Sequence, residues 1–318
     1  MIFNCILIII GVAIVLYGAD RLTAGASALA RRMNIPEIII GLTIVAAGTS
    51  APEFFVSFMS AVKGTPDMAV GNAVGSNIFN VLLIVGVTAM VTPIRVSAST
   101  VSKDMPWAIA ASVLFLALCF DRLSLSLSGC TVSRLDGVIL LVFFALFMRQ
   151  TLRAARAGKA DASCTRQKKD SVAKNILFFI AGLAMLILGS NIFVDSASSV
   201  ATSLGVSQGV IGLTIVAGGT SLPELATSVV AARKGNSAIA IGNVIGSNVF
   251  NILAILGTTA VVCPMKMEGI TSMDIFVMGA SMFLLWLFSY TKLTVARWEG
   301  AILTSLFTIY MIYLLSNI

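Results

Sequence analysis

The chain has 318 residues, of which 58% are hydrophobic and 11% charged, with a mean hydropathy of +1.00 and a formal net charge of +7. This composition lies far from that of soluble domains. Apolar segments of about 20 residues recur from end to end, and each is long enough to cross a hydrocarbon core of ~30 Å. The sequence therefore predicts a polytopic helical membrane protein. The basic residues sit at helix ends and in one loop, as topology determinants do, so binding to nucleic acid is not expected.

Breaks at glycine, proline and charge clusters predict ten membrane spans. The first lies near 2–20, continues as helix to about 32, and lacks the basic start of a cleaved signal. The others lie near 35–63, 67–92, 104–120, 134–153, 174–199, 206–233, 237–262, 271–290 and 297–316. A basic linker too short for a folded domain separates two sets of five. We predict a first five-helix repeat over 1–153, a linker over 154–173 and a second repeat over 174–318.

An internal repeat relates the two sets. Adding 171 to each residue number maps 41–93 onto 212–264 without a gap, and 30 of these 53 positions are identical. The stretch GLTIVAAGTSAPE, which ends at Glu53, returns as GLTIVAGGTSLPE, which ends at Glu224. Because five spans are an odd number, the second set crosses the membrane in the opposite sense. The fold class is therefore all-α, with two inverted five-helix repeats, as in many secondary transporters.

The distribution of basic residues predicts the orientation. With the N-terminus outside, 17 of the 21 Lys and Arg residues fall on the inner side. We therefore expect a multi-pass protein of the cell membrane, with both termini outside and the linker in the cytoplasm. Asp20 and Asp195 lie toward the ends of the first and sixth spans and receive no role from the sequence.

Two acidic residues fall in mid-membrane. Twelve of the 14 acidic residues lie at or near span ends, whereas Glu53 and Glu224 lie inside spans, with no Lys or Arg at their depth. A carboxylate there costs at least ~2.5 kcal/mol. It is either protonated, satisfied by internal hydrogen bonds or bound to a cation, and its surroundings favour the cation.

Those surroundings are rich in oxygen atoms. Pro52 has no N–H for the carbonyl of Gly48, so we expect freed carbonyls over 46–49, and over 217–220 before Pro223. Thr49 and Ser50 lie four and three residues before Glu53, on its helical face. Carbonyls at such helix breaks hold Na⁺ in transporters.

The following span of each half adds a polar stripe. Asn72, Ser76 and Asn80 step by four residues along one side of the helix, and Asn243, Ser247 and Asn251 repeat the pattern. A polar stripe in lipid must face protein or water. Packed against the glutamates, it would complete a pocket in which Ser76, Asn80, Ser247 and Asn251 are the expected ligands. Asn77 and Asn248 point to another face and are expected to bond only between helices.

The pocket chemistry selects the ion class. Oxygen ligands with two carboxylates suit Ca²⁺ and Na⁺, whereas Zn²⁺ or copper would call for histidine or thiolate. The chain has no histidine, and its five cysteines are scattered without metal-ligand spacing. An enzymatic role for Ser50 as a nucleophile lacks a base. We expect no enzyme activity and no cofactor, only transported ions.

GTSAPE with GNAVGSN, and GTSLPE with GNVIGSN, resemble the repeats of the cation/calcium exchanger superfamily, in its prokaryotic sodium/calcium exchanger branch. The resemblance covers both halves of the chain. It implies alternating access by sliding of the first and sixth helices over the other eight. It also implies a Ca²⁺ site at Glu53, Glu224 and the carbonyls of Thr49 and Thr220. The Na⁺ sites would add Ala46, Ser50, Ser76, Ala217, Ser221 and Ser247.

The resemblance further implies a Na⁺/Ca²⁺ antiporter that exchanges three Na⁺ for one Ca²⁺ and is electrogenic. Asparagine at both 80 and 251 argues against K⁺ dependence, and long regulatory loops are missing. The alternatives are a Ca²⁺/H⁺ antiporter, in which the glutamates take up protons, and a cation channel with the same lining. The expected partners are Ca²⁺, Na⁺ and the lipid bilayer, with no obligatory protein partner.

Overall fold

The computed structural model describes the chain except for 120–130, 162–171, 206–216, 267–269 and 317–318. The predicted all-α membrane class is confirmed, because eight helices in the described residues are long and apolar enough to span a membrane, and a bent helix pair there adds a ninth candidate. The first part of the expected seventh span, 206–216, lies outside the described residues, and helices α11 and α12 continue it.

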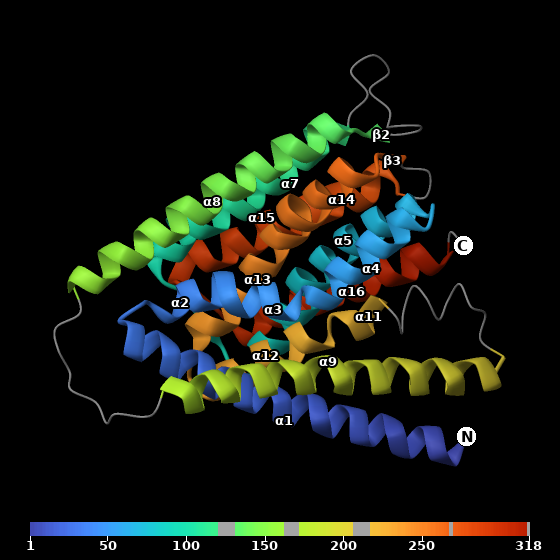
Figure 1. The fold of residues 1–318 in the computed structure, drawn as a ribbon, viewed down its shortest axis with the longest axis horizontal. Coiled ribbons are helices and arrows are strands. Elements are labelled where there is room, and N and C mark those ends of the chain that lie inside the picture. The colour runs from blue at the N-terminus through green and yellow to red at the C-terminus, as the bar shows by residue number, and fades with distance from the viewer. Residues whose placement is uncertain (120–130, 162–171, 206–216, 267–269, 317–318) are drawn as a thin grey trace.

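The two halves run through equivalent elements (Figure 1). The first contains α1 (Ile2–Met33), α2 (Glu37–Ile40), η1 (Gly41–Val45), α3 (Ala46–Thr49), α4 (Ala51–Val62), α5 (Pro66–Ile78), η2 (Phe79–Val85), α6 (Gly86–Val91), β1 (Ile94–Arg95), η3 (Thr100–Asp104), α7 (Met105–Cys119), β2 (Thr131–Val132) and α8 (Arg134–Asp161). The second contains α9 (Val172–Ser203), α11 (Ala217–Thr220), α12 (Leu222–Arg233), α13 (Ser237–Val249), η5 (Phe250–Leu256), α14 (Gly257–Val262), β3 (Met265–Lys266), α15 (Ser272–Lys292), β4 (Thr294–Val295) and α16 (Arg297–Ser316).

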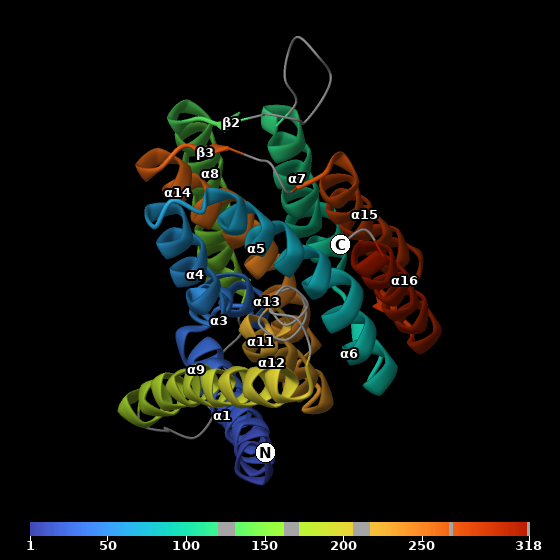
Figure 2. The same cartoon turned by 90° about the vertical axis from the view of Figure 1, so that its right-hand side faces the viewer.

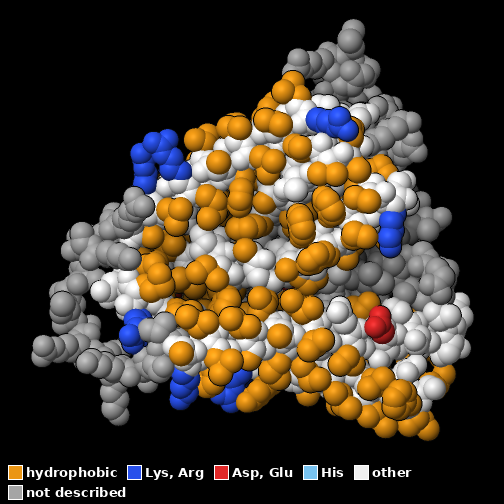
Figure 3. Space-filling model, viewed as in Figure 1, with side chains coloured by type: hydrophobic (Ala, Val, Ile, Leu, Met, Phe, Trp, Pro, Cys, Tyr) orange, Lys and Arg blue, Asp and Glu red, His pale blue; other side chains and the backbone are white. Residues whose placement is uncertain are grey.

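Both chain termini lie at the same end of the molecule, as an even number of crossings requires (Figure 1). We name this the termini end. The opposite end, where α8 finishes and α9 begins, is named the linker end. Helix α8 continues to Asp161, beyond the limit expected at 153, and α9 begins at Val172. In the face shown in Figure 3, Lys and Arg side chains lie toward the two ends and apolar side chains cover the belt between them.

Helices α1 and α9 form an antiparallel pair along one side of the bundle (Figures 1 and 2). Glycines at seven-residue spacing bring their backbones into contact. A Cβ added to Gly11 would lie 2.9 Å from the carbonyl oxygen of Gly189, and one added to Gly18 would lie 2.9 Å from that of Gly182. Only glycine fits such a seam, which lets the two helices pack as one unit.

The third and eighth spans occupy the centre of the bundle. In the most apolar stretch of each span, 67% of the residues are buried in the third and 89% in the eighth, against 22% in α1. A polar group on these two spans is therefore shielded from lipid. The stripes predicted from the sequence lie on them.

Both central spans contain a π-helical segment at equivalent positions, η2 and η5. The sequence pattern did not predict them, since a step of four residues also fits an ordinary α-helix. Asn80 and Asn251 are the second residues of these segments. A π turn shifts the side chains that follow it around the helix, and such turns are frequent at functional sites.

Two short antiparallel ribbons tie the halves together. Strand β1 pairs with β4, with Ile94 opposite Val295, and β2 pairs with β3, with Val132 opposite Met265. Each ribbon joins a segment of one half to a segment of the other. Both ribbons lie next to a central span, since β1 follows α6 and β3 follows α14.

Candidate ion-binding site

The second span is broken at Ser50. The segments 37–49 and 51–62 meet at an angle of 46°, and Ser50 has φ −81° and ψ 6°, outside the helical range. Pro52 is the second residue of α4, where a missing N–H is tolerated at the start of a helix. The break falls where the sequence placed it. The carbonyl of Ala46 is not freed, however, because it accepts the N–H of Ser50 at 2.9 Å.

The second half has the same break. Ser221 lies between α11 and α12 with φ −91° and ψ 5°, close to the values at Ser50. Ala217 opens α11 and Thr220 ends it. Pro223 cannot donate an N–H to the carbonyl of Gly219, and that carbonyl instead accepts the hydroxyl of Ser190 from α9. The α9 hydroxyl thus compensates for the backbone bond that proline removes.

Each glutamate is held by the serine of the opposite half. Glu53 and Glu224 are each 1% exposed. The hydroxyl of Ser221 donates to Oε1 of Glu53 at 3.2 Å, and that of Ser50 donates to Oε1 of Glu224 at 3.2 Å. The two broken helices therefore face each other, and their carboxylates share one site.

The serines of the central spans join this site. The hydroxyl of Ser247 donates to Oε1 of Glu224 at 3.4 Å. Ser76 accepts a hydrogen bond from Ser221 at 3.4 Å. Thr49 is fully buried, and its hydroxyl contacts Oδ1 of Asn243 at 3.0 Å. The structure thus gathers residues from four helical segments that the sequence had placed on two separate repeats.

The four asparagines bond across the halves in a reciprocal pattern. The amide of Asn80 donates to Oδ1 of Asn248 at 3.0 Å, and that of Asn251 donates to Oδ1 of Asn77 at 3.0 Å. The expectation that Asn77 and Asn248 bond between helices is confirmed. The N–H groups of the Asn80 and Asn251 amides make these bonds, so the side-chain oxygens of the two residues are not used in them.

Four buried oxygens in this cluster have no hydrogen-bond partner among the described residues. They are Oε2 of Glu53, Oε2 of Glu224, Oδ1 of Asn80 and Oδ1 of Asn251, two equivalent pairs. The ion pairs in the described part of the chain, Arg31–Glu37 and Lys234–Asp20, involve neither buried glutamate. Buried acceptors without donors are costly, and a bound cation would offset that cost.

Two further asparagines support the glutamate backbones, a role that sequence reasoning did not assign. The amide of Asn72 donates to the carbonyl of Glu53 at 3.2 Å and to Ser57 at 2.9 Å. Asn243 makes the equivalent bond to the carbonyl of Glu224 at 3.5 Å. The sequence signal for this supporting role was that the two asparagines occupy matching positions in the repeat. Their partners could not be identified before the helices were placed.

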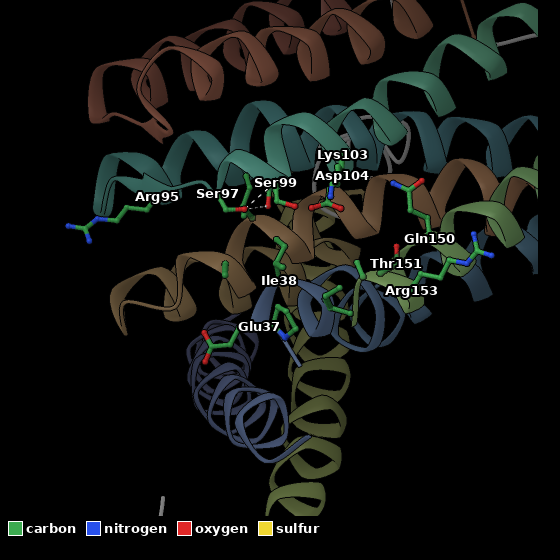
Figure 4. Close-up of a pocket in the computed structure, with 16 residues that line it drawn as sticks. Glu37, Ile38, Arg95, Ser97, Ser99, Lys103, Asp104, Gln150, Thr151 and Arg153 are labelled. Atoms are coloured by element: carbon green, nitrogen blue, oxygen red, sulfur yellow. Dashed lines mark hydrogen bonds between the residues drawn. The ribbon is translucent and has the colours of Figure 1, made fainter. Parts of the chain in front are cut away.

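A separate cavity of about 870 Å³ opens at the linker end, and neither buried glutamate lines it. Its rim carries Arg95, Lys103, Arg153, Glu37 and Asp104 (Figure 4). Arg95 and Arg153 point to opposite sides in this view, so these two cations do not converge on one ligand. The cavity is distinct from the glutamate site.

An inverted-repeat bundle with buried, unpartnered oxygen atoms at its centre is typical of membrane ion transporters. The family model of the sodium/calcium exchanger protein matches residues 3–151 and 174–316, and the chain belongs to this family. It is therefore a transporter of the exchanger class, as its motifs indicated.

Relatives support this assignment over the full length. The putative antiporter CaxA of Alkalimonas amylolytica is 37% identical over 327 residues, covering 100% of both chains. The sodium/calcium exchanger MaX1 of Methanosarcina acetivorans is 32% identical, covering 98% of each chain. The solved structure of the sodium-calcium exchanger NCX_Mj, soaked with Na⁺ and Sr²⁺, superimposes with a TM-score of 0.84 at 31% identity and 98% coverage of both chains.

The amide pattern leads to a first prediction. Replacing Asn77 by Leu removes the acceptor for the Asn251 amide, which can then rotate its oxygen away from the site. We expect Ca²⁺ affinity, measured by calorimetry on purified protein, to fall by about 10- to 100-fold, the usual range for partners that orient a metal ligand. Asn248→Leu should act in the same way through Asn80. An unchanged affinity in both variants would show that the amide oxygens are not ligands.

Proposed function

We propose that the chain is a Na⁺/Ca²⁺ antiporter in which Na⁺ and Ca²⁺ compete for the site between Glu53 and Glu224. The observation that carries this proposal is the set of four buried, unpartnered oxygens contributed equally by the two halves. Two carboxylates and two amide oxygens suit a hard cation, and two negative charges balance one Ca²⁺. The names of the relatives, among them a sodium/calcium exchanger, favour the same cargo.

The ligand assignment within the site is part of this proposal. Ca²⁺ would be held by Glu53, Glu224 and the carbonyls of Thr49 and Thr220. Na⁺ would draw on the same groups, with the additional candidates Ala46, Ser50, Ser76, Ala217, Ser221 and Ser247. The amide oxygens of Asn80 and Asn251, which lack hydrogen-bond partners among the described residues, would contact whichever of the two cations occupies the site. The crossed serine bonds support it, since Ser50 and Ser221 each contact the opposite carboxylate. The carbonyl oxygen of Ala46 already accepts the N–H of Ser50, so it would bind Na⁺ through its second lone pair.

The charge of the site suggests an electrogenic cycle. Two carboxylates with one Ca²⁺ are neutral, whereas the same groups with three Na⁺ carry a charge of +1. Exchange of three Na⁺ for one Ca²⁺ would therefore move net charge and respond to membrane voltage. The linker end would face the cytoplasm and both termini the outside, in accordance with the basic-residue count.

A Ca²⁺/H⁺ antiporter is the second candidate, because buried carboxylates can exchange a cation for protons. The buried site and the paired broken helices favour a carrier over a channel, which requires a continuous pore.

Uptake of ⁴⁵Ca²⁺ into proteoliposomes preloaded with Na⁺ tests the proposal. We expect uptake to require an outward Na⁺ gradient and to increase when the membrane potential compensates the net charge moved. Liposomes preloaded with K⁺, or carrying only a proton gradient, serve as controls. Uptake driven by protons and indifferent to Na⁺ would establish the Ca²⁺/H⁺ antiporter instead.

A further inference from the structure

The two halves are not in equivalent positions. Helix α1 packs along α12, on the linker side of Glu224. The equivalent contact would place α9 along α4, yet no comparable packing joins them in the described residues, and Figures 1 and 2 show these helices apart. Since the repeats are inverted, α1 covers α12 on the linker side, whereas among the described residues α9 does not cover α4 on the termini side. The structure therefore represents one of the two orientations of the site.

Side chains fasten α1 to the end of α12 in this orientation. Nζ of Lys234 lies 2.6 Å from Oδ1 of Asp20 and donates to the backbone carbonyl of Asp20 at 3.0 Å. Two turns further along α1 and just after α12, the amide of Asn236 donates to the hydroxyl of Ser27 at 2.7 Å. We name these four residues, Asp20, Ser27, Lys234 and Asn236, the latch.

The equivalent positions at the termini end form no such ion pair or side-chain hydrogen bond in the described part of the chain. The offset of 171 relates Lys234 to Lys63, but it relates Asp20 to Asn191, so the lysine is kept and the acid is not. Lys63 forms no ion pair in the described part of the chain. The hydroxyl of Ser198, equivalent to Ser27, is buried without a hydrogen-bond partner among the described residues. The sequence thus supplies an ion pair for one closed end only.

The interface between α1 and α12 contains polar groups of the kind expected where two helices separate and admit water. Thr23 of α1 and Thr227 of α12 are fully buried, and the hydroxyls of both lack partners among the described residues. Thr227 lies one turn beyond Glu224 toward the linker end. Their equivalents, Val194 and Val56, are apolar. An unpartnered hydroxyl is unfavourable in the closed interface and becomes hydrated when α1 leaves α12.

We propose that Asp20 and Lys234 are gate residues that stabilise the orientation closed at the linker end, so that the exchanger rests with its site directed toward the termini end. This inference rests on the proposed function for its cargo, but the gate itself concerns only the position of α1. Because Asn191 stands where a second latch would need an acid, the two orientations differ in stability. Asp20, to which the sequence assigned no role, thereby sets the resting orientation.

Thiol accessibility in ion-free nanodiscs tests the latch without transport. Thr227→Cys and Val56→Cys, each in a background without the native cysteines, report the linker-end and termini-end interfaces respectively. Asp20→Asn should raise the labelling rate of the Thr227→Cys thiol about two- to fivefold, the range expected for a partly exposed ion pair. It should lower the rate at Val56→Cys, because the population shifts to the other orientation.

Three further variants make the test specific. Asn191→Asp creates the missing acid opposite Lys63 and should also favour the orientation closed at the termini end, so the pair Asp20→Asn with Asn191→Asp should invert the resting state. Asp20→Lys with Lys234→Asp should restore the original rates. Asp195→Asn, which removes an exposed acid from α9, should change neither rate.

The outcomes separate the gate from the cargo. Faster labelling at both thiols would indicate general loosening and would overturn the latch, as would unchanged rates in Asp20→Asn. The reciprocal shift in a protein without Na⁺-driven Ca²⁺ uptake would uphold the latch and reject the proposed function. Normal Na⁺-driven Ca²⁺ uptake without the reciprocal shift in labelling would reject the latch and uphold the proposed function.

Discussion

Replacement of Glu53 or Glu224 by Gln is expected to reduce Na⁺-driven ⁴⁵Ca²⁺ uptake at least 100-fold in proteoliposomes. Each glutamine keeps the shape and one oxygen but removes half of the formal charge that balances Ca²⁺. A 100-fold loss corresponds to about 2.8 kcal/mol, less than the whole interaction of a buried carboxylate with a divalent ion. The two variants should be equally affected, because each carboxylate has the same serine bond from the opposite half.

Stability distinguishes this loss from misfolding. Oε2 of each glutamate is buried without a hydrogen-bond partner among the described residues, so in protein prepared without Ca²⁺ or Na⁺ a neutral side chain should relieve a cost. We expect the melting temperature without Ca²⁺ to stay the same or rise, and the increase on adding Ca²⁺ to disappear. Glu37→Gln, which alters a partly buried glutamate at the start of α2 that lies outside the glutamate site, is the matched control and should transport normally. Near-normal uptake by either Glu53→Gln or Glu224→Gln would reject the site.

Replacement of Gly246 by Ala is expected to produce the second largest effect. The added Cβ would lie 2.6 Å from the Cβ of Ala46 and 2.7 Å from the carbonyl oxygen of Leu42. Neither neighbour is the end of a flexible side chain, so α13 must move away from η1 and α3. Overpacking of this kind costs about 1–3 kcal/mol. It also displaces the segment that leads directly into the break at Ser50, and Ca²⁺ affinity should fall with stability.

A matched substitution isolates the cause. A Cβ on Gly279 of α15 would meet only the Cβ of Ser112, at 3.9 Å, an ordinary contact. Gly279→Ala should therefore leave both the melting temperature and Ca²⁺ binding close to those of the parent protein, and the propensity of alanine for helices favours it. If Gly246→Ala were as well tolerated as Gly279→Ala, the close packing of α13 against α3 would not position the site.

The sequence by itself determined the class of protein, the inverted repeat and the two buried glutamates. These follow from local properties: the length of the apolar segments, the offset of 171 between copies and the cost of a charge at mid-membrane. The helix breaks also followed from the sequence, since Pro52 and Pro223 act on their own backbone. The prediction that the carbonyl of Ala46 is freed was wrong, because the N–H of Ser50 still donates to it across the break.

Only the tertiary structure decided which groups meet. Ser50 and Glu224 are separated by 174 residues, as are Asn77 and Asn251, and no periodicity within one helix specifies such a partner. The π turns that carry Asn80 and Asn251 are likewise invisible in a stripe with a four-residue step. The unequal positions of α1 and α9 are also a property of the packed bundle. Two similar repeats cannot reveal from their sequences alone which end is closed, and the pairing of Asp20 with Lys234 is seen only once α1 lies on α12.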